Sequence, residues 1–231
     1  MKKMKLLFVL VLFSWTTGTY AQVDMESLVT MIKSNLSQSK ENIRNYEWIE
    51  TTKAYVKGEL KSTKQNQCYY SVDGKLTKVE TGGTEEAKTP GGIRGRVVEN
   101  KKDDMIDYIS KAADEIAAYL PPEPAKIQQI YTDGKVGIQI LEPNKIFKLS
   151  FPDYIKQGDV LSITIDKVNQ KLKAFNVTTY IDDPSEKVIF DVTLLDLPDG
   201  TQFVSTVTLV AEAKNLKIDL QNSGYKRGAG Q

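Results

Sequence analysis

Hydrophobic and polar positions recur with two different periods, and these periods separate the expected helices from the expected strands. Over residues 24–46, apolar side chains recur at spacings of three, four and seven, which predicts an amphipathic helix with Asp24 as its N-cap. From Glu47 the period changes to two, and β-forming residues continue this pattern until Gly58. We therefore expect an amino-terminal helix followed directly by a strand.

A hairpin and then a glycine-rich segment follow this first strand. Residues 67–72 and 75–79 lie on either side of Asp73-Gly74, a dipeptide that favours a tight hairpin turn. They complete three consecutive early strands. Residues 81–96 contain five glycines and few apolar side chains, so we expect a flexible loop there.

Two further helices are expected in the middle of the chain. Residues 102–120 repeat apolar side chains at spacings of three and four, and Pro121-Pro122 ends this helix. A shorter helical segment is expected over residues 124–131. The apolar stripe of the longer helix needs a partner surface, which a sheet can supply.

The second half of the chain has the alternation and the turn signals of strands almost throughout. Short turns rich in Pro, Asn, Asp and Gly separate the successive segments. The expected strands are residues 136–141, 146–151, 160–165, 171–181, 187–195, 202–213 and 216–220.

Strands in series with short links form an antiparallel meander, and the early strands bring the total to about ten. A sheet of that width curls, so we expect the α+β class: a curved antiparallel sheet or half-barrel with two to three helices packed on it as a lid. Strands 171–181 and 202–213 carry apolar residues on both faces, so neither face can simply meet water. Incomplete filling between helices and sheet produces an apolar cavity.

The first residues have the layout of a secretory signal peptide. Residues 1–5 include three lysines, residues 6–15 are apolar except for Ser14, and the segment ends in small and polar residues at Ala21. Ten residues rise only about 15 Å as a helix, roughly half the hydrocarbon thickness of a bilayer. We expect cleavage after Ala21, with an uncleaved amino-terminal anchor as the alternative.

Cleavage leaves residues 22–231 as a single domain without a membrane span. The expected location is the periplasm, with secretion as the second choice, and the expected state is a monomer. This mature chain carries 28 basic and 30 acidic side chains.

Composition excludes several classes of function. The near-neutral charge and the lack of any long basic run argue against nucleic-acid binding. Without any His, the chain has no Ser-His-Asp or Cys-His nucleophile system and no zinc site that uses imidazole. Cys68 is the only cysteine and is best explained as a small buried residue. We therefore expect neither an enzyme nor a metal or other cofactor.

The order of elements resembles the periplasmic LolA/LolB-like lipoprotein-carrier superfamily. The segments that carry the resemblance are YEWIETTKAYVKGEL, CYYSVDGKLTKVE, LPDGTQFVSTVTL and LKIDLQNSGY. The basic-Pro-aromatic sequence usual in the early strands of the carriers is absent here, so the resemblance is to a distant relative with the same fold. It implies a half-barrel whose helices close over an apolar cavity.

Two groups of side chains are candidates for ligand binding. The flexible segment places Arg94 and Arg96 where paired guanidinium donors could hold an anionic head group, although a solvated loop is the simpler explanation. Aromatic residues could line the cavity or simply fill a core, and Ile109 belongs to the apolar stripe of the expected lid helix. The cavity candidates are Trp48, Tyr55, Tyr70, Phe175, Tyr180, Phe203 and Ile109.

Two functions from different classes fit these observations. The first is a non-enzymatic carrier or binding protein for a lipid, an acyl chain or a lipidated polypeptide, with the helix 102–120 and the loop 82–96 acting together as its lid. The second is an envelope scaffold with a filled core and no small-molecule ligand. The volume of the apolar cavity distinguishes them.

Overall fold

The computed structural model describes residues 25–84, 93–119 and 122–228. The expected signal peptide, residues 1–21, lies outside the described residues. Helices and strands follow one another in the order expected from the hydrophobic pattern. The elements are α1 (Met25–Asn42), η1 (Ile43–Asn45), β1 (Tyr46–Val56), β2 (Glu59–Tyr70), β3 (Leu76–Thr84), α2 (Ile93–Ala117), α3 (Pro124–Thr132), β4 (Gly137–Glu142), β5 (Ile146–Pro152), β6 (Val160–Asp166), β7 (Lys171–Tyr180), β8 (Lys187–Asp196), β9 (Gln202–Ala211), η2 (Glu212–Lys214) and β10 (Leu216–Arg227).

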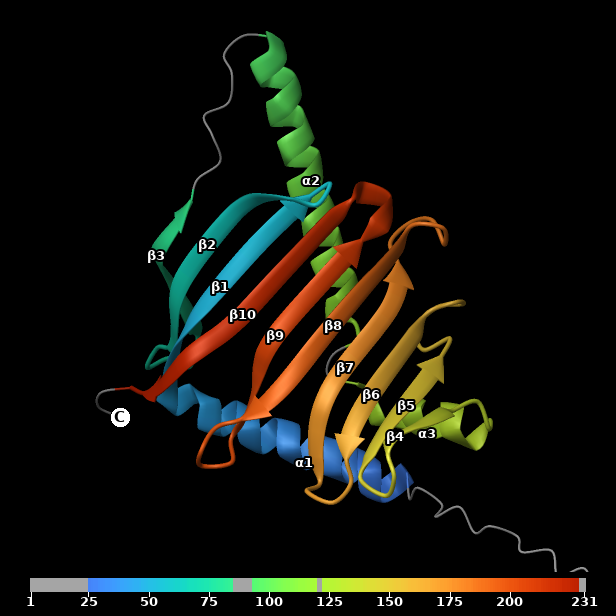
Figure 1. Ribbon diagram of the computed structural model, residues 1–231. Coiled ribbons are helices and arrows are strands. Elements are labelled where there is room, and N and C mark those ends of the chain that lie inside the picture. The colour runs from blue at the N-terminus through green and yellow to red at the C-terminus, as the bar shows by residue number, and fades with distance from the viewer. Residues whose placement is uncertain (1–24, 85–92, 120–121, 229–231) are drawn as a thin grey trace, which may run out of the picture.

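All ten strands form one open, curved antiparallel sheet in the order β3-β2-β1-β10-β9-β8-β7-β6-β5-β4 (Figure 1). The carboxyl-terminal meander runs from β4 to β10, and β10 then pairs with β1 in a register that includes Val56↔Leu216 and Glu50↔Asn222. This pairing joins the early strands to the late ones. The fold class predicted from the sequence, an α+β half-barrel of about ten strands with two to three helices, is confirmed.

The helices lie against one face of the sheet, which we call the helix face; the opposite face is the outer face. In Figure 1, α2 passes behind the strands and α1 crosses one end of the sheet. Alternation along the strands sends every second side chain to the helix face, as it does for Leu161, Ile163 and Ile165 of β6. These residues pack with Ile127 and Ile130 of α3 in the main core. None of the helices in the described parts of the chain is long and apolar enough to cross a membrane.

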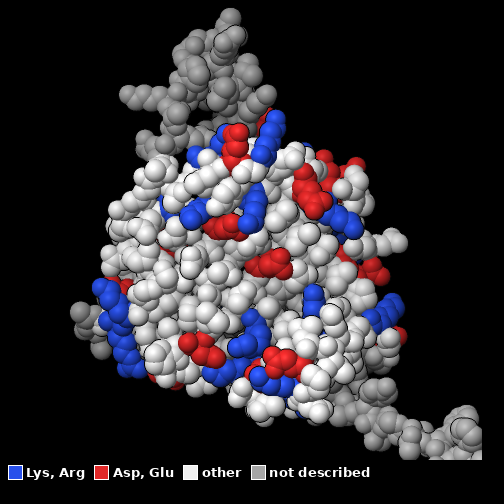
Figure 2. Space-filling view, in the orientation of Figure 1, with Lys and Arg blue, Asp and Glu red and all other residues white. Residues whose placement is uncertain are grey.

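The outer face carries charged groups of both signs, interspersed with uncharged residues (Figure 2). No region of this face is dominated by one sign of charge. The described part of this face shows no continuous basic surface of the kind that binds the phosphate backbone of a nucleic acid.

Several strands and helices extend beyond the boundaries predicted from the sequence. The strand expected at 67–72 begins at Glu59, because pairing with β1 on one side and β3 on the other satisfies its polar backbone despite a polar sequence. The strand expected to end at Leu220 continues to Arg227, again because β1 supplies its hydrogen bonds. Tertiary pairing therefore overrides local propensity at both places.

The flexible loop predicted over residues 81–96 is wrong at both ends. The strand β3 continues to Thr84, and α2 already begins at Ile93. Gly83 explains the first error: a Cβ at this position would lie 2.6 Å from the backbone oxygen of Thr63, so glycine permits the close approach of β3 to β2. Residues 85–92 lie outside the described part of the chain.

Candidate ligand-binding face

The surface between α2 and the neighbouring strands is the first part of the candidate site. Ala112 is buried there with Val188 of β8, Leu209 and Ala211 of β9, and Leu216 of β10. We call this group the α2 cluster. Around its buried centre lie side chains that are only partly buried, namely Val56, Met105, Tyr108, Ile109, Phe190, Ile181 and Ile218.

The packing of the α2 cluster differs from that of the main core. Counted over the described residues, the main core contains fifteen buried side chains, including Phe151 and Tyr119, whereas the α2 cluster contains five. The side chain of Met105 is flexible and fills irregular spaces. A surface with such a side chain can repack around a bound ligand. An apolar ligand at the α2 cluster therefore displaces fewer fully buried side chains than one in the main core.

Tyr108 adds a polar atom to this apolar surface. Among the described residues, its hydroxyl group is buried without a hydrogen-bond partner. Burial raises the pKa of this hydroxyl, and Lys214 lies 5.3 Å from the centre of its ring. A buried hydroxyl without a partner costs free energy, so this atom is available to a hydroxyl, ester or carboxylate group of a ligand.

An aromatic cluster occupies the helix face at the opposite ends of the same strands. The Trp48 ring of β1 stacks on the Tyr225 ring of β10, with ring centroids 5.4 Å apart. The Tyr70 ring of β2, on the other side of β1, has its centroid 6.0 Å from that of Trp48. The ring centroid of Phe203 in β9 lies 4.3 Å from that of Tyr225. The Tyr46 ring packs edge-on against Tyr225, with centroids 6.5 Å apart. These five residues, from β1, β2, β9 and β10, are the aromatic cluster.

Hydrogen bonds hold the aromatic cluster in place. The indole nitrogen of Trp48 donates to Asn222 Oδ1 at 3.1 Å, and the Asn222 amide donates in turn to the carbonyl of Val204 at 2.9 Å. Burial raises the pKa of the Tyr225 hydroxyl well above its ordinary value. These contacts orient the rings, so the cluster is a rigid apolar wall.

A short polar ladder lies next to the aromatic cluster on the helix face. Glu50 accepts hydrogen bonds from Lys78 at 2.7 Å and from Asn66 at 3.3 Å. Cys68, which pairs with Trp48 across the strands, is fully buried beside this ladder. Burial, and next the Glu50 charge, raise the pKa of the Cys68 thiol, so the thiol stays protonated and unreactive near neutral pH.

A hollow of about 690 Å³ opens beside the aromatic cluster, where β1 begins and β10 ends. Its charged side chains have ion-pair partners: Arg227 lies 3.2 Å from Asp199, Glu47 lies 3.0 Å from Lys226, and Arg44 lies 3.4 Å from Glu41. The buried Nε of Arg44, however, has no hydrogen-bond partner among the described residues. The hollow is therefore a polar opening whose described charges are largely paired with one another. Its lining residues are Arg44, Asn45, Tyr46, Glu47, Gln67, Tyr69, Tyr70, Val79, Arg227 and Gly228.

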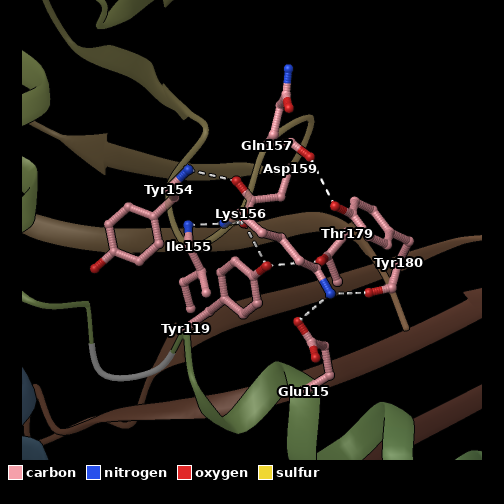
Figure 3. A network of polar contacts seen from close by, with 9 residues as sticks. All are labelled: Glu115, Tyr119, Tyr154, Ile155, Lys156, Gln157, Asp159, Thr179 and Tyr180. Atoms are coloured by element: carbon pink, nitrogen blue, oxygen red, sulfur yellow. Dashed lines mark hydrogen bonds and ion pairs between the residues drawn. The ribbon is translucent and has the colours of Figure 1, made fainter. Parts of the chain in front are cut away.

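A buried network fastens the carboxyl-terminal end of α2 to the sheet (Figure 3). The hydroxyl of Tyr119, just beyond α2, donates to Asp159 at 2.7 Å and lies 2.8 Å from the hydroxyl of Thr179 in β7. Asp159 also accepts the backbone amides of Tyr154, Ile155 and others in the same turn. All three linked side chains are almost completely buried, so the network fixes this end of α2.

A second contact reinforces this anchor at its rim. Lys156 forms an ion pair with Glu115 of α2 at 2.7 Å and donates to the carbonyl of Tyr180. Its ammonium group also lies 4.2 Å from the centre of the Tyr180 ring. Both partners of the ion pair are largely buried, so the contact resists screening by salt better than a surface pair does. We call this contact and the buried network together the α2 anchor.

The structure brings some of the predicted cavity residues together and separates others. Trp48, Tyr70 and Phe203 meet in the aromatic cluster, and Ile109 belongs to the α2 cluster. Phe175 lies in the main core instead.

Tyr55 and Tyr180 do not share the helix face with these residues. Tyr55 alternates with the inward-facing Val56, and Lys217 lies over its ring at 5.7 Å. Tyr180 follows the buried Thr179 and lies under Lys156 at the end of β7. Both strands carry apolar and aromatic residues on each face, so the sequence does not distinguish the inward face from the outward one.

The predicted head-group residues Arg94 and Arg96 fall within the range of α2 rather than in a loop. Their side chains lie outside the described part of the structure. An anion contact at these residues therefore stays a prediction.

Several residues of the site were not predicted from the sequence. Tyr225 lies in a polar segment that the sequence analysis placed beyond the last strand, and a single aromatic residue among polar neighbours was its only signal. The helical period predicts Tyr46 at the end of the first helix, whereas this residue begins β1. Tyr119 and Asp159 are joined only in the folded chain, across forty positions of sequence.

The comparisons with known proteins give a weak structural likeness. No family model matches the chain, and no curated protein sequence matches it. A DUF1329 family protein from Desulfovibrio piger has a TM-score of 0.39 at 6% identity, covering 90% of this chain and 94% of that one. A "putative outer membrane lipoprotein-sorting protein domain" from Vibrio parahaemolyticus has a TM-score of 0.37 at 8% identity, covering 90% and 95%. Both TM-scores are too low to support a conclusion about function. Evidence for a function has to come from the geometry of the site.

Proposed function

We propose that the protein is a non-enzymatic binding protein of the cell envelope that shelters an acyl chain between α2 and the sheet. The ligand is a lipid, a fatty acyl chain or the lipid group of a polypeptide. The observation that carries this proposal is the α2 cluster, where a continuous apolar surface from a helix and four strands is mostly only partly buried.

The two ends of the helix face contact different parts of a bound amphiphile. The acyl chain packs in the α2 cluster against Ile109, where removing about 200 Å² of apolar surface from water gains about 5 kcal/mol before ordering costs are subtracted. The aromatic cluster continues the apolar wall along β1 and β10, and the hollow beside Tyr46 leaves a polar exit for a head group. Specificity for the acyl chain comes from shape and apolar contact rather than from charge.

The lid in this proposal is α2 alone. Its carboxyl-terminal end is held by Tyr119 and Asp159, whereas its contacts along the α2 cluster are apolar and incomplete. Opening therefore pivots at the α2 anchor and separates Met105 and Ile109 from β9 and β10. The loop 82–96, expected from the sequence to form part of the lid, is not a loop at its two ends. It begins within β3 and finishes within α2.

Displacement of a fluorescent fatty-acid analogue tests the proposal. The variant Ile109→Asp places a charge in the α2 cluster and should weaken binding at least tenfold. Its matched control is Ile106→Asp on the same helix, because Ile106 is 53% exposed and does not belong to the α2 cluster. Circular dichroism of both variants shows whether the fold is retained, and the milder Ile109→Ala serves if the charged variant unfolds.

Two results overturn the proposal. One is a wild-type protein that binds no amphiphile up to the concentration at which micelles form. The other is equal binding by folded Ile109→Asp and Ile106→Asp. The envelope scaffold with a filled core then replaces it, and the extensive burial in the main core is the feature that favours that alternative.

A further inference from the structure

The two edges of the sheet differ in how they are protected against pairing with another strand. On β3, the outermost strand at one edge, Lys78 and Glu80 place charges on the edge, and Gly82 and Gly83 interrupt its side chains. Charges and irregularities of this kind are what natural proteins use to prevent edge-to-edge association. The strand β4 at the opposite edge reads Gly-Ile-Gln-Ile-Leu before its first charge, at Glu142.

The side chains of β4 are exposed although they are apolar. Ile138 is 52% exposed and Ile140 is 54% exposed, and both point to the helix face because they pair with Leu149 and Phe147 of the main core. Leu141 is 47% exposed as well. Among the described residues, β4 has β5 as its only neighbour, so one edge of its backbone is left without a strand partner. This edge therefore combines backbone N–H and C=O groups that lack a strand partner with apolar side chains that nothing in the described structure covers.

We propose that β4 pairs antiparallel with β4 of a second copy of this chain, with Gln139 of each subunit at the two-fold axis. In an antiparallel pair, opposed residues point to the same face. A register centred on Gln139 sets Ile138 opposite Ile140 of the partner subunit, twice. The exposed isoleucines of both subunits then cover one another and extend the apolar helix face across the junction.

Charge and shape at the two ends of β4 favour a second copy over an unrelated strand. Lys135 comes just before the strand and Glu142 ends it, and both are exposed. Antiparallel pairing brings Glu142 of one subunit close to Lys135 of the partner subunit at each end. Gly137, near the bulged end of the partner strand, adds no side chain there. Glu142 also pairs with Lys145 at 2.9 Å, an exposed contact that contributes little to stability.

The length of the strand limits the strength of this dimer. A bulge between Ile140 and Glu142 ends the regular pairing, so the straight part of the edge is Gly137–Ile140. Stable interfaces bury about 1,200–2,000 Å² in total, more than so short a strand supplies. The dimer is therefore weak and concentration-dependent, and it replaces the monomer expected from the sequence.

A cysteine at the proposed axis tests the register directly. Opposed residues of an antiparallel pair have Cα atoms about 4.5–5.5 Å apart, which suits a disulfide. In a Cys68→Ser background, Gln139→Cys should form a covalent dimer under mild oxidation. Val79→Cys at the other edge is the matched control, since Val79 is also exposed on an edge strand, and it should stay monomeric.

Sedimentation of the full chain over a concentration series gives the second measurement. Ile140→Lys should weaken self-association at least tenfold, whereas Leu76→Lys, an exposed site on the opposite edge strand, should leave it unchanged. A wild-type chain that stays monomeric up to about 500 µM overturns the proposal. So does equal cross-linking of Gln139→Cys and Val79→Cys, or a dimer that Ile140→Lys does not weaken.

Discussion

Removing one hydroxyl group from the α2 anchor is the sharpest test of how the lid is held. Tyr119→Phe deletes the donor to Asp159 and the partner of Thr179, and it leaves the ring and its packing in the main core. Asp159 keeps its backbone donors, but it loses the only side chain that joins it to α2 in the described structure. The hydroxyl of Thr179 is left buried without a partner.

The expected magnitude follows from these two losses. A hydrogen bond to a charged acceptor contributes about 1.5–3 kcal/mol, and a buried hydroxyl left unpaired costs about 1–3 kcal/mol more when it cannot rotate to a new partner. Relaxation recovers part of this, so we expect a loss of about 2–3 kcal/mol in the free energy of unfolding. For a domain of about 200 residues, that corresponds to a fall in Tm of roughly 4–12 °C.

Urea denaturation of the wild type and the variant measures the loss. Tyr180→Phe is the matched control, because its hydroxyl donates to the Gln157 carbonyl at the exposed rim and its removal should cost less than about 0.5 kcal/mol. The double variant Tyr119→Phe with Thr179→Val should cost clearly less than the sum of the two single changes, since both remove the same contact. Equal losses in Tyr119→Phe and Tyr180→Phe would refute the view that this network anchors α2.

Three further predictions concern the early strands and the turn between β8 and β9. Cys68 should not react with iodoacetamide at pH 8 in the native protein and should react once urea unfolds it; rapid labelling of the folded chain, followed by mass spectrometry, contradicts its burial. Gly83→Ala should destabilise the protein by about 1–3 kcal/mol in urea, because its Cβ would overlap a backbone oxygen of β2, whereas Gly82→Ala should be nearly neutral; similar midpoints for the two variants argue against that close approach. The hydrogen bond from Tyr46 lowers the pKa of Asp199, so its contribution is present above about pH 4 and is lost as the pH falls further. Asp199→Asn should therefore reduce the Tm at pH 6, and the difference from the wild type should shrink steadily as the pH falls from about 4 towards 2; a constant difference across that range contradicts the linkage.

Local signals determine much of this fold, because strand and helix periods are properties of neighbouring residues. The alternation of the seven late strands was correct to within a few residues for most of them, and the hairpin at Asp73-Gly74 was confirmed by a positive φ of 76° at Gly74. Short turns between strands leave an antiparallel meander as the simple topology. The α+β class and the curved sheet followed from that count of strands and from the helical stripes.

Tertiary structure alone decided which faces and segments meet. The pairing of Val56 with Leu216 joins residues far apart in sequence, and nothing in either segment specifies the other as its partner. That pairing extends β10 through Tyr225 and thereby creates the aromatic cluster. Several strands are apolar on both sides, so only packing against the helices determined that Trp48 points inward while Tyr55 points outward. A backbone alternates faces with a period of two, but the choice of the buried face is made by the surface that covers it.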